Sequence, residues 1–295
     1  MKKHAIFTVV VGNYDALSQP LEVDNETDYI LFTNDIKESR IGVWDVHPIN
    51  YNHEDRTRIA RWVKTHPHLL LPEHESSLWL DANIQINTSY IYNRIKELNE
   101  RQSVRVASIP HPEFDCIYDE LFDMLLHHYE HEDIILKWGQ KLRKECYPRH
   151  NSTFETGLLF RKHHDNQVAM FDELWWNSIE HYSRRDQLSF SYSLWKNNLV
   201  CEPFFTDGTN VRNNSSVNYL QHQNTSGKYL LWNKQEAWLC RYAERNSEKS
   251  YKISNLYYWI YSTHHPQMWA KCLGQYFRIL DIVHRRILAP KKTKK

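Results

Sequence analysis

Residues 77–84 read Ser-Leu-Trp-Leu-Asp-Ala-Asn-Ile, a short apolar run that ends in Asp81 and Asn83. An apolar run of this length closed by turn-forming residues is typical of a buried strand. Alternation along a strand predicts that Asp81 and Asn83 lie on the same side. Two oxygen donors at a strand end suit a hard cation, Mg²⁺ or Mn²⁺. The same residues are also common in a simple turn, so spacing alone leaves both interpretations open.

Around this segment, apolar runs alternate with helical patterns in the first half of the chain. This alternation predicts an α/β sandwich with a mixed, mostly parallel sheet. Ligands of such sheets bind beyond the carboxyl ends of the strands. The expected strands are 5–11, 29–33, 42–46, 77–80 and 104–108, and the expected helices are 55–65 and 90–98.

The second half is richer in helical patterns, and a polar stretch at 207–228 is expected to form an ordered loop or lid. No internal repeat or low-complexity linker divides the chain. We therefore expect one main domain, residues 1–229, followed by a C-terminal helical extension with a basic tail, residues 230–295. The expected helices of this half are 114–129, 132–145, 165–181 and 186–196, and the expected strands are 153–161 and 199–205.

Composition excludes several broad classes of protein. Hydrophobic residues make up 41% of the 295 residues and aromatic residues 14%, which argues against disorder. Only 7 residues are glycine, so a collagen-like or glycine-rich chain is excluded. The five cysteines are odd in number and contain no C-x-x-C pair, which predicts a reduced, cytoplasmic protein.

No apolar run reaches the roughly 18 residues that a membrane-spanning helix needs. The apolar stretch at 5–11 is short and lacks a small-residue cleavage site, so it predicts a strand rather than a signal peptide. The dinucleotide loop G-x-G-x-x-G, the P-loop and the G-x-S-x-G elbow are all absent from the sequence. Rossmann dehydrogenases, P-loop enzymes and α/β-hydrolases are therefore disfavoured.

The net charge of +1 is unevenly distributed, because residues 278–295 hold seven Lys or Arg and one Asp. The body carries no excess of positive charge, so no nucleic-acid partner is expected. Residues 268–288 have an amphipathic pattern followed by this basic end. Such a segment can lie on an anionic membrane surface. A helix packed on the body with a frayed basic end is an equally good interpretation of the same pattern.

Two further groups of residues have chemistry suited to a site. Arg61 and Lys64 are three apart on the expected helix and share a face, where they could meet phosphates or simply be solvated. Asp186 stands where a helix begins, after Ser183. It is placed either to favour the helix dipole or to act as a general base near a reacting hydroxyl.

Taken together and in order, these motifs resemble one family. The segments are TVVVGNYD (8–15), FTND (32–35), the R-x-x-K of Arg61 and Lys64 followed by His-Pro-His, SLWLDANI (77–84), HPEFDCIYDE (111–120) and SRRDQLSF (183–190). The chain is similar, over roughly residues 4–205, to the glycosyltransferase-like domain of bacterial polysaccharide and capsule clusters and plant mucilage-related proteins. That family is assigned to the GT-A fold of nucleotide-diphospho-sugar transferases.

The resemblance implies a function as well as a fold. It implies transfer of a sugar from a nucleotide-diphosphate donor to a hydroxyl of a glycan or lipid-linked acceptor, in capsule or lipopolysaccharide biosynthesis. It also implies a cytoplasmic protein, peripheral at the inner membrane if the tail binds lipid. The stereochemical outcome, the donor sugar and the acceptor stay open.

The resemblance implies a role for each of a set of residues. Asp81 and Asn83 match a DxD-like metal motif for Mn²⁺ or Mg²⁺, with Ala82 in place of the usual Gly, and His222 is a candidate third ligand. Asp186 matches an Arg-Asp-Gln motif and is the expected catalytic carboxylate. The remaining implied roles are the nucleoside pocket for Thr8, Gly12, Tyr14 and Asp35, the diphosphate for Arg61 and Lys64, the sugar for His111, Tyr118 and Glu120, and the acceptor side for Glu155 and Arg161.

Two alternatives of other classes are weighed against this interpretation. His127 and His131 bracket an H-x-x-E-H pattern, which on one helix can hold zinc with Glu130 as the base of a metallopeptidase. A degenerate transferase could instead keep the fold and bind a glycan without catalysis. Bound zinc, or the lack of any donor binding, would distinguish these alternatives from a transferase.

Overall fold

The computed structural model describes residues 4–12, 16–127, 129–220 and 279. The chain divides into two compact units. The first unit comprises Met1–Ile117 and Glu145–Ser226, and the second comprises Tyr118–Lys144 and Gly227–Lys295. The predicted boundary between residues 229 and 230 lies outside the described residues and stays a prediction. The assignment of Tyr118–Lys144 to the second unit was not predicted.

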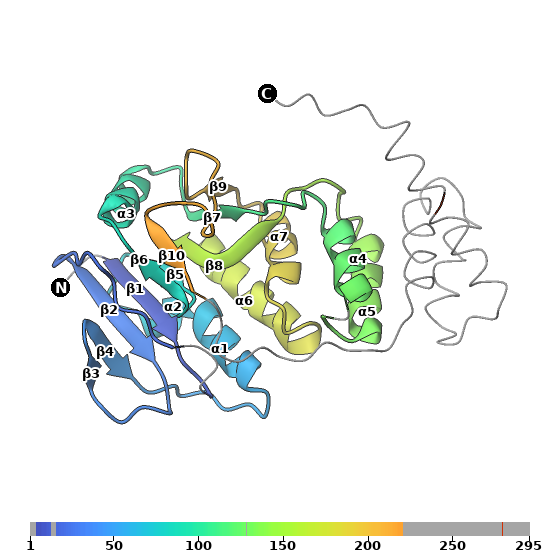
Figure 1. Ribbon diagram of the computed structural model, residues 1–295. Coiled ribbons are helices and arrows are strands. Elements are labelled where there is room, and N and C mark those ends of the chain that lie inside the picture. Colours follow the sequence, from blue (N-terminus) through green and yellow to red (C-terminus); the bar gives the residue numbers. More distant parts are fainter. Residues whose placement is uncertain (1–3, 13–15, 128, 221–278, 280–295) are drawn as a thin grey trace. The chain divides into compact units, whose positions relative to one another are not determined.

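The first unit is built on an eight-stranded mixed sheet (Figure 1). Six strands run in one direction, whereas β3 and β8 run antiparallel to their neighbours. The prediction of an α/β fold with a mixed, mostly parallel sheet is confirmed. In spatial order the strands are β3 (Arg40–Ile41), β4 (Trp44–His47), β2 (Thr27–Phe32), β1 (His4–Val9), β5 (Ser76–Leu80), β8 (Phe154–Arg161), β7 (Val106–Pro110) and β9 (Cys201–Pro203).

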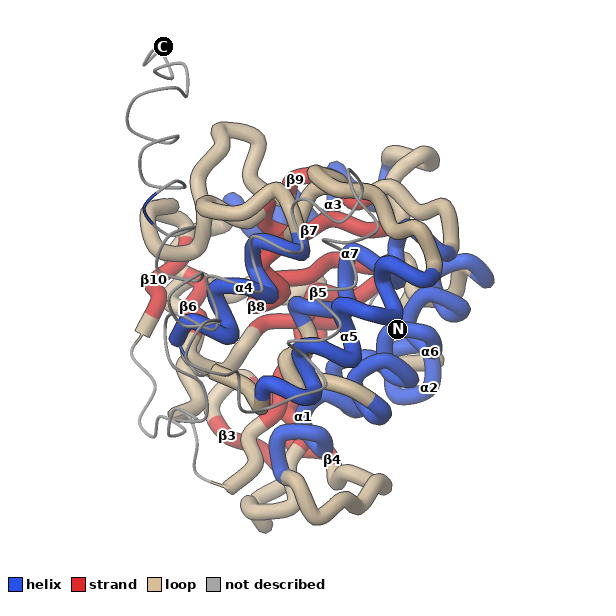
Figure 2. Tube along the Cα trace, turned by 90° about the vertical axis from the view of Figure 1, so that its right-hand side faces the viewer, coloured by secondary structure: helices blue, strands red, loops and turns tan. Residues whose placement is uncertain are grey.

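Apolar layers cover both faces of this sheet. Figure 2 shows the strands in red with helices beside them in blue. On one face, Val63 of α1 (Arg56–Thr65), Trp175 of α6 (Asn166–His181) and Phe190 of α7 (Gln187–Lys196) pack on the strands. The short helix α2 (Pro67–Leu70) follows α1. On the other face lie α3 (Tyr90–Glu100) and a two-stranded ribbon of β6 (Ile84–Ile86) and β10 (Val217–Tyr219). Because both faces are covered, the central strands read as continuous apolar runs.

Local sequence signals fix the helices that carry the site. The carboxylate of Asp55 accepts a hydrogen bond from the backbone N–H of Thr57 and caps α1. Asp165 caps α6 in the same way, through the N–H groups of Gln167 and Val168. Such caps satisfy orphan donors of the first turn and contribute about 1 kcal/mol each. They explain why both helices begin within a residue of their predicted starts.

A β-bulge interrupts the pairing of β7 with β8 between Ser108 and Ile109. The buried Ser108 hydroxyl donates to the carbonyls of Glu155 and Leu158, both at 2.8 Å, and so satisfies the backbone where the ladder is broken. Bulges often re-aim side chains beside active sites. Here the bulge places Thr156 and Gly157 opposite the end of β5, where Asp81 follows.

The described part of the second unit consists of two helices, α4 (Ile117–His127) and α5 (Glu132–Lys144). Buried apolar residues recur along both at helical spacing, including Leu121 and Leu125 on α4 and Ile135 and Trp138 on α5. The Arg143 guanidinium lies over the Tyr118 ring at 5.6 Å. The predicted helical character from residue 230 onward, and the basic tail, lie outside the described residues apart from Ile279.

Among the described residues, no helix is long and apolar enough to cross a membrane. The three cysteines in this part of the chain, Cys116, Cys146 and Cys201, are free. Within the polar stretch 207–228, the structure describes turns and β10 as far as Leu220.

Candidate active site at the carboxyl edge of the sheet

Asp81 lies in a turn directly after β5. The Asp81 N–H donates to the Gly157 carbonyl at 2.8 Å, and the Asp81 carbonyl accepts from the Ile84 N–H. Because β5 ends at Leu80, the strand alternation expected for Asp81 and Asn83 does not apply to them. The turn, not a strand, sets where these two side chains point.

Aromatic and glycine neighbours hold the Asp81 carboxylate in place. Its Oδ1 accepts a hydrogen bond from the Trp79 indole N–H at 2.8 Å, and its side chain is 30% exposed. Its Oδ2 lies over Gly157, where the methyl group of an alanine would come within 3.1 Å of that oxygen. Glycine at 157 therefore leaves the room that the carboxylate occupies.

Asn83 is buried and tied to the end of the described chain. Its Nδ2 donates to the Leu220 carbonyl at 2.9 Å, and its own carbonyl accepts from the Leu220 N–H. Within the described residues, the Asn83 Oδ1 is buried without a hydrogen-bond partner. An amide oxygen without a partner, two residues from a partly exposed carboxylate, is the kind of donor pair that would suit Mg²⁺ or Mn²⁺. His222, the expected third ligand, lies outside the described residues.

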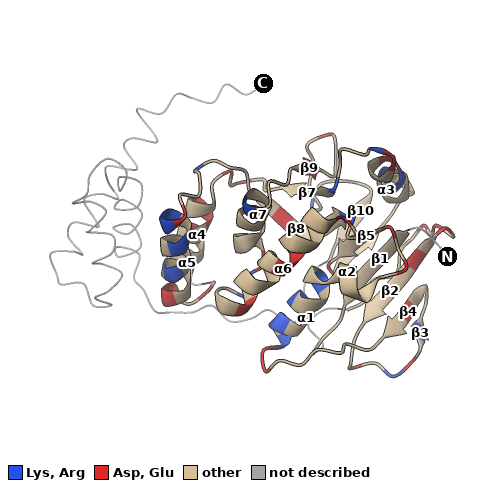
Figure 3. Cartoon of the chain, turned by 180° about the vertical axis from the view of Figure 1, so that it is seen from behind, with Lys and Arg blue, Asp and Glu red and all other residues tan. Residues whose placement is uncertain are grey.

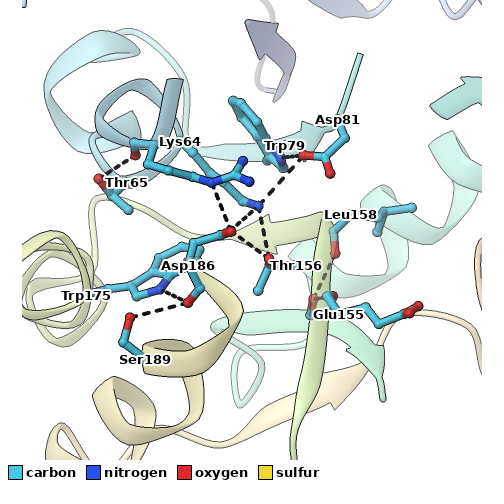
Figure 4. A network of polar contacts seen from close by, with 12 residues as sticks. Lys64, Thr65, Trp79, Asp81, Glu155, Thr156, Leu158, Trp175, Asp186 and Ser189 are labelled. Atoms are coloured by element: carbon cyan, nitrogen blue, oxygen red, sulfur yellow. Dashed lines mark hydrogen bonds and ion pairs between the residues drawn. The ribbon is translucent and has the colours of Figure 1, made fainter. Parts of the chain in front are cut away.

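Lys64 links Asp81 to Asp186 (Figure 4). Its Nζ lies 2.5 Å from Asp186 Oδ2, 3.1 Å from the Thr156 hydroxyl and 3.8 Å from Asp81 Oδ1. The Arg61 Nε forms a second ion pair with Asp186 Oδ1 at 2.9 Å. Basic residues colour much of α1 in Figure 3. Three elements thus bring their charges together: α1, the N-terminus of α7, and the turn after β5.

The Asp186 carboxylate is buried and surrounded by donors. Its residue is 4% exposed, and the Thr156 hydroxyl donates to Oδ2 at 2.7 Å in addition to the two cations. Burial alone would raise the pKa of this carboxyl group. The charges of Arg61 and Lys64, with the hydrogen bonds from Lys64 and Thr156, outweigh burial and hold the pKa of Asp186 well below its usual range. Asp186 is therefore ionised throughout the physiological range.

Asp186 stands at the first position before α7, but its side chain does not cap that helix. The indole N–H of Trp175 donates to the Asp186 carbonyl at 2.8 Å, and the Ser183 hydroxyl accepts from the Arg185 N–H. Because the charge of Asp186 lies at the N-terminus of α7, the interpretation that it favours the helix dipole stays open. Its catalytic role stays a prediction.

Arg161 lies in the core beneath this cluster. It is fully buried, its Nη1 pairs with Asp172 Oδ1 at 2.5 Å, and its Nη2 donates to the Lys64 carbonyl at 2.6 Å. Full burial leaves no Arg161 surface for direct contact with an acceptor, and its expected role beneath the acceptor stays a prediction. Arg161 anchors the C-terminal turn of α1.

The expected nucleoside-pocket residues lie at the ends of β1 and β2. Gly12 has φ of +70°, a conformation that favours glycine, and its N–H donates to Asp35 Oδ2 at 2.5 Å. Thr8 is buried in β1, and its Oγ1 has no hydrogen-bond partner within the described residues. The structure thus joins Gly12 to Asp35. Tyr14 lies outside the described residues, and the nucleoside role of this group stays a prediction.

The other expected sugar and acceptor residues have contacts of their own. Glu155 is directed away from Asp186 (Figure 4), and its Oε1 pairs with the Arg212 guanidinium at 2.5 Å. His111 follows β7 and its Nδ1 accepts from the N–H groups of the next turn. Tyr118 and Glu120 belong to α4 in the second unit. The roles of these four residues stay predictions.

The metallopeptidase alternative needs both histidines on one helix. α4 ends at His127, and His131 precedes α5, which begins at Glu132. The described part of the chain also holds no group of three or more His, Cys, Asp or Glu side chains placed to bind a metal. The i, i+4 geometry on which the zinc interpretation depends is therefore absent.

Sequence reasoning missed three residues that shape this site. Trp79 fixes Asp81, Thr156 donates to Asp186, and Arg212 pairs with Glu155. Trp79 and Thr156 each stand within or next to a segment that the sequence marks out. Their roles follow from contacts with residues distant in sequence, and Thr156 and Lys64 are 92 residues apart.

The fold is an α/β sheet, and acidic and basic side chains lie together beyond the carboxyl ends of its strands. This is the edge at which α/β proteins bind their ligands. The model of one family, the TOD1/MUCI70 glycosyltransferase-like domain, matches residues 3–214. The chain belongs to this family and carries a glycosyltransferase-like domain.

Other comparisons add little to this assignment. One solved structure that the chain resembles is that of WbbM, a bifunctional glycosyltransferase, with 8% sequence identity and a TM-score of 0.40. The likeness covers 68% of this chain and 38% of that one. A comparison with curated proteins finds no match.

Proposed function

We propose that this protein transfers a sugar from a nucleotide-diphosphate donor to a hydroxyl of a glycan or lipid-linked acceptor in surface-polysaccharide assembly. The observation that carries this proposal is the position of Lys64, within 3.8 Å of Asp81 and 2.5 Å of Asp186. It unites the DxD-like turn, the basic helix and the Arg-Asp-Gln motif at the edge where α/β proteins bind ligands.

The donor's diphosphate would meet this edge through charge. Arg61 is the most exposed cation of the cluster, with its side chain 24% exposed, whereas Lys64 is buried. Arginine presents a planar set of donors that matches phosphate oxygens. We assign direct contact with the diphosphate to Arg61, and we assign to Lys64 the internal charge that holds Asp81 and Asp186 together.

A divalent cation, Mn²⁺ or Mg²⁺, would be held by Asp81 Oδ2 and Asn83 Oδ1. When bound, it would stabilise the negative charge that develops on the departing nucleoside diphosphate. The chain's own contribution is to orient these oxygens: Trp79 holds Asp81, and Leu220 holds Asn83. Contact of the tail with an anionic membrane, and any part played by His222, concern residues outside those described and stay predictions.

A screen of nucleotide sugars by thermal shift, with and without Mn²⁺, tests the proposal. Ligand at a hundredfold excess over its dissociation constant stabilises the folded state by about 2.7 kcal/mol. We expect a metal-dependent shift with one UDP-, GDP- or CMP-sugar. The absence of a shift with every donor, and of released nucleoside diphosphate, would instead favour a non-catalytic glycan-binding module.

Arg61→Gln and Arg56→Gln form a matched pair for this screen. Both side chains belong to α1, but only Arg61 pairs with Asp186. The proposal predicts that Arg61→Gln weakens the donor-induced shift. An equal loss in Arg56→Gln, whose guanidinium lies against Gly12, would show that donor binding is not specific to Arg61.

A further inference from the structure

The buried carboxylate of Asp186 faces cations on both of its oxygens. Arg61 Nε lies at Oδ1, whereas Lys64 Nζ and the Thr156 hydroxyl both lie at Oδ2. Lys64 and Thr156 donate hydrogen bonds to Oδ2, and Arg61 Nε makes an ion-pair contact with Oδ1 at 2.9 Å. A general base must accept a proton from the acceptor hydroxyl at hydrogen-bond distance. Such a hydroxyl would have to reach the buried Oδ1 beside the Arg61 guanidinium.

The charged side chains of Arg61, Lys64 and Asp186 differ in their exposure to solvent. Lys64 and Asp186 are buried, with side chains 1% and 6% exposed, while Arg61 is 24% exposed. Lys64 and Asp186 neutralise each other in the interior, where an unpaired charge is costly. These three residues together therefore present one positive charge, and Arg61 presents it nearest to solvent.

The backbone around Asp186 is fixed from below. The Trp175 indole donates to the Asp186 carbonyl, and the ring of Trp175 lies 5.8 Å from Lys64 Nζ. Arg161 holds the Lys64 carbonyl from β8. These contacts leave Asp186 little freedom to leave the cations and approach a substrate.

We propose that Asp186 is a positioning residue, whose carboxylate holds the Arg61 guanidinium in the orientation that binds the donor diphosphate, and that it does not remove the acceptor proton. This inference rests on the proposed function. It replaces the general-base role expected for Asp186 with an effect on donor binding through Arg61.

The test is a double-mutant cycle in nucleotide affinity. Titration calorimetry with UDP, GDP and CDP, each with Mn²⁺, measures the wild-type chain, Asp186→Asn, Arg61→Gln and the double variant. If Asp186 acts through Arg61, each single variant weakens the binding of the preferred nucleotide about tenfold, and the double variant is no weaker than either single one, because residues that act as a unit are not additive.

Asp172→Asn is the matched control. It also removes the charge of a buried carboxylate on an element beside α7, but Asp172 pairs with Arg161 and not with Arg61. Its effect should multiply with that of Arg61→Gln. Thermal unfolding of every variant checks folding, and Arg61→Gln, whose side chain is partly exposed, keeps the Lys64–Asp186 pair and needs no repacking.

The outcomes separate the two proposals. A wild-type chain that binds none of the three nucleotides contradicts the proposed function and the inference with it. A wild-type chain that binds, while folded Asp186→Asn binds equally well, overturns the inference alone. Losses from Asp186→Asn and Arg61→Gln that multiply would show that Asp186 does not act through Arg61.

Discussion

Replacing one partner of the Arg161–Asp172 pair should reveal how firmly the base of the site is held. Both side chains are 0% exposed, and their ion pair spans 2.5 Å. In Asp172→Leu the guanidinium stays buried without its counter-ion. Removal of one partner from a buried pair costs about 3–5 kcal/mol. We therefore expect the free energy of unfolding of Asp172→Leu to fall by about that amount.

The double variant Arg161→Met/Asp172→Leu should be less destabilised than the single one. Replacing a buried pair by apolar side chains of similar volume is often neutral or stabilising by about 1–4 kcal/mol. Here the double variant also loses the hydrogen bond from Arg161 to the Lys64 carbonyl, which costs about 1 kcal/mol. The double variant should thus lie between about 1 kcal/mol less stable and about 3 kcal/mol more stable than the wild type.

Urea unfolding followed by tryptophan fluorescence measures all three proteins. Trp175 is fully buried beside the pair, with the Arg161 guanidinium 6.0 Å from its ring, and it is one of 11 tryptophans whose combined emission follows unfolding. A single variant that loses less than about 1 kcal/mol would refute the reasoning. A double variant as unstable as the single one would do the same.

Three further predictions concern other parts of the described chain. Gly157→Ala should reduce metal-dependent nucleotide binding and leave the unfolding midpoint nearly unchanged. The new methyl group would lie 3.1 Å from Asp81 Oδ2 and displace it by a few tenths of an ångström. Unchanged binding in calorimetry would contradict this. Burial lowers the pKa of His163 in the folded chain to about 3, whereas the unfolded chain takes up this proton from about pH 6.5. The free energy of unfolding should therefore fall as the pH falls from 6.5 toward 3. Urea unfolding from pH 7.5 to 4.5 should show a shallower decline in His163→Gln than in the wild type. Glu155→Gln should change the free energy of unfolding by less than about 1 kcal/mol, since its partner Arg212 has a half-exposed side chain. It should lower the rate of sugar transfer if Glu155 lines the acceptor side. An unchanged rate would remove Glu155 from that role.

Hydrophobic periodicity, together with capping and turn residues, was enough to predict most elements of the first unit. The strand at 77–80 and the helix at 55–65 appear as β5 and α1, because an apolar run and an Asp cap are local signals. The sequence did not predict β6 and β10, which are three residues each and pair across more than 130 residues. Nor did it predict the antiparallel insertion of β8 between β5 and β7.

The candidate site was predicted as a set of residues but not as an arrangement. Arg61, Lys64, Asp81 and Asp186 all stand out in the sequence, and the structure brings them together. A sequence motif does not reveal which charges pair. Asp186 forms an ion pair with a lysine 122 residues away, and this lysine occupies its Oδ2. The burial of Arg161 and its pairing with Asp172 were not predicted for the same reason, because both arise only on folding.

Metal-dependent nucleotide binding by wild type and Asp81→Asn tests the central claim most directly. Calorimetry would use the nucleoside diphosphate preferred in the screen, with Mn²⁺ and with EDTA. The account predicts that wild type binds more tightly with Mn²⁺ and that Asp81→Asn, which keeps the shape of the side chain but not its charge, loses this dependence. Equal metal dependence in both proteins would place the donor site elsewhere and contradict the account.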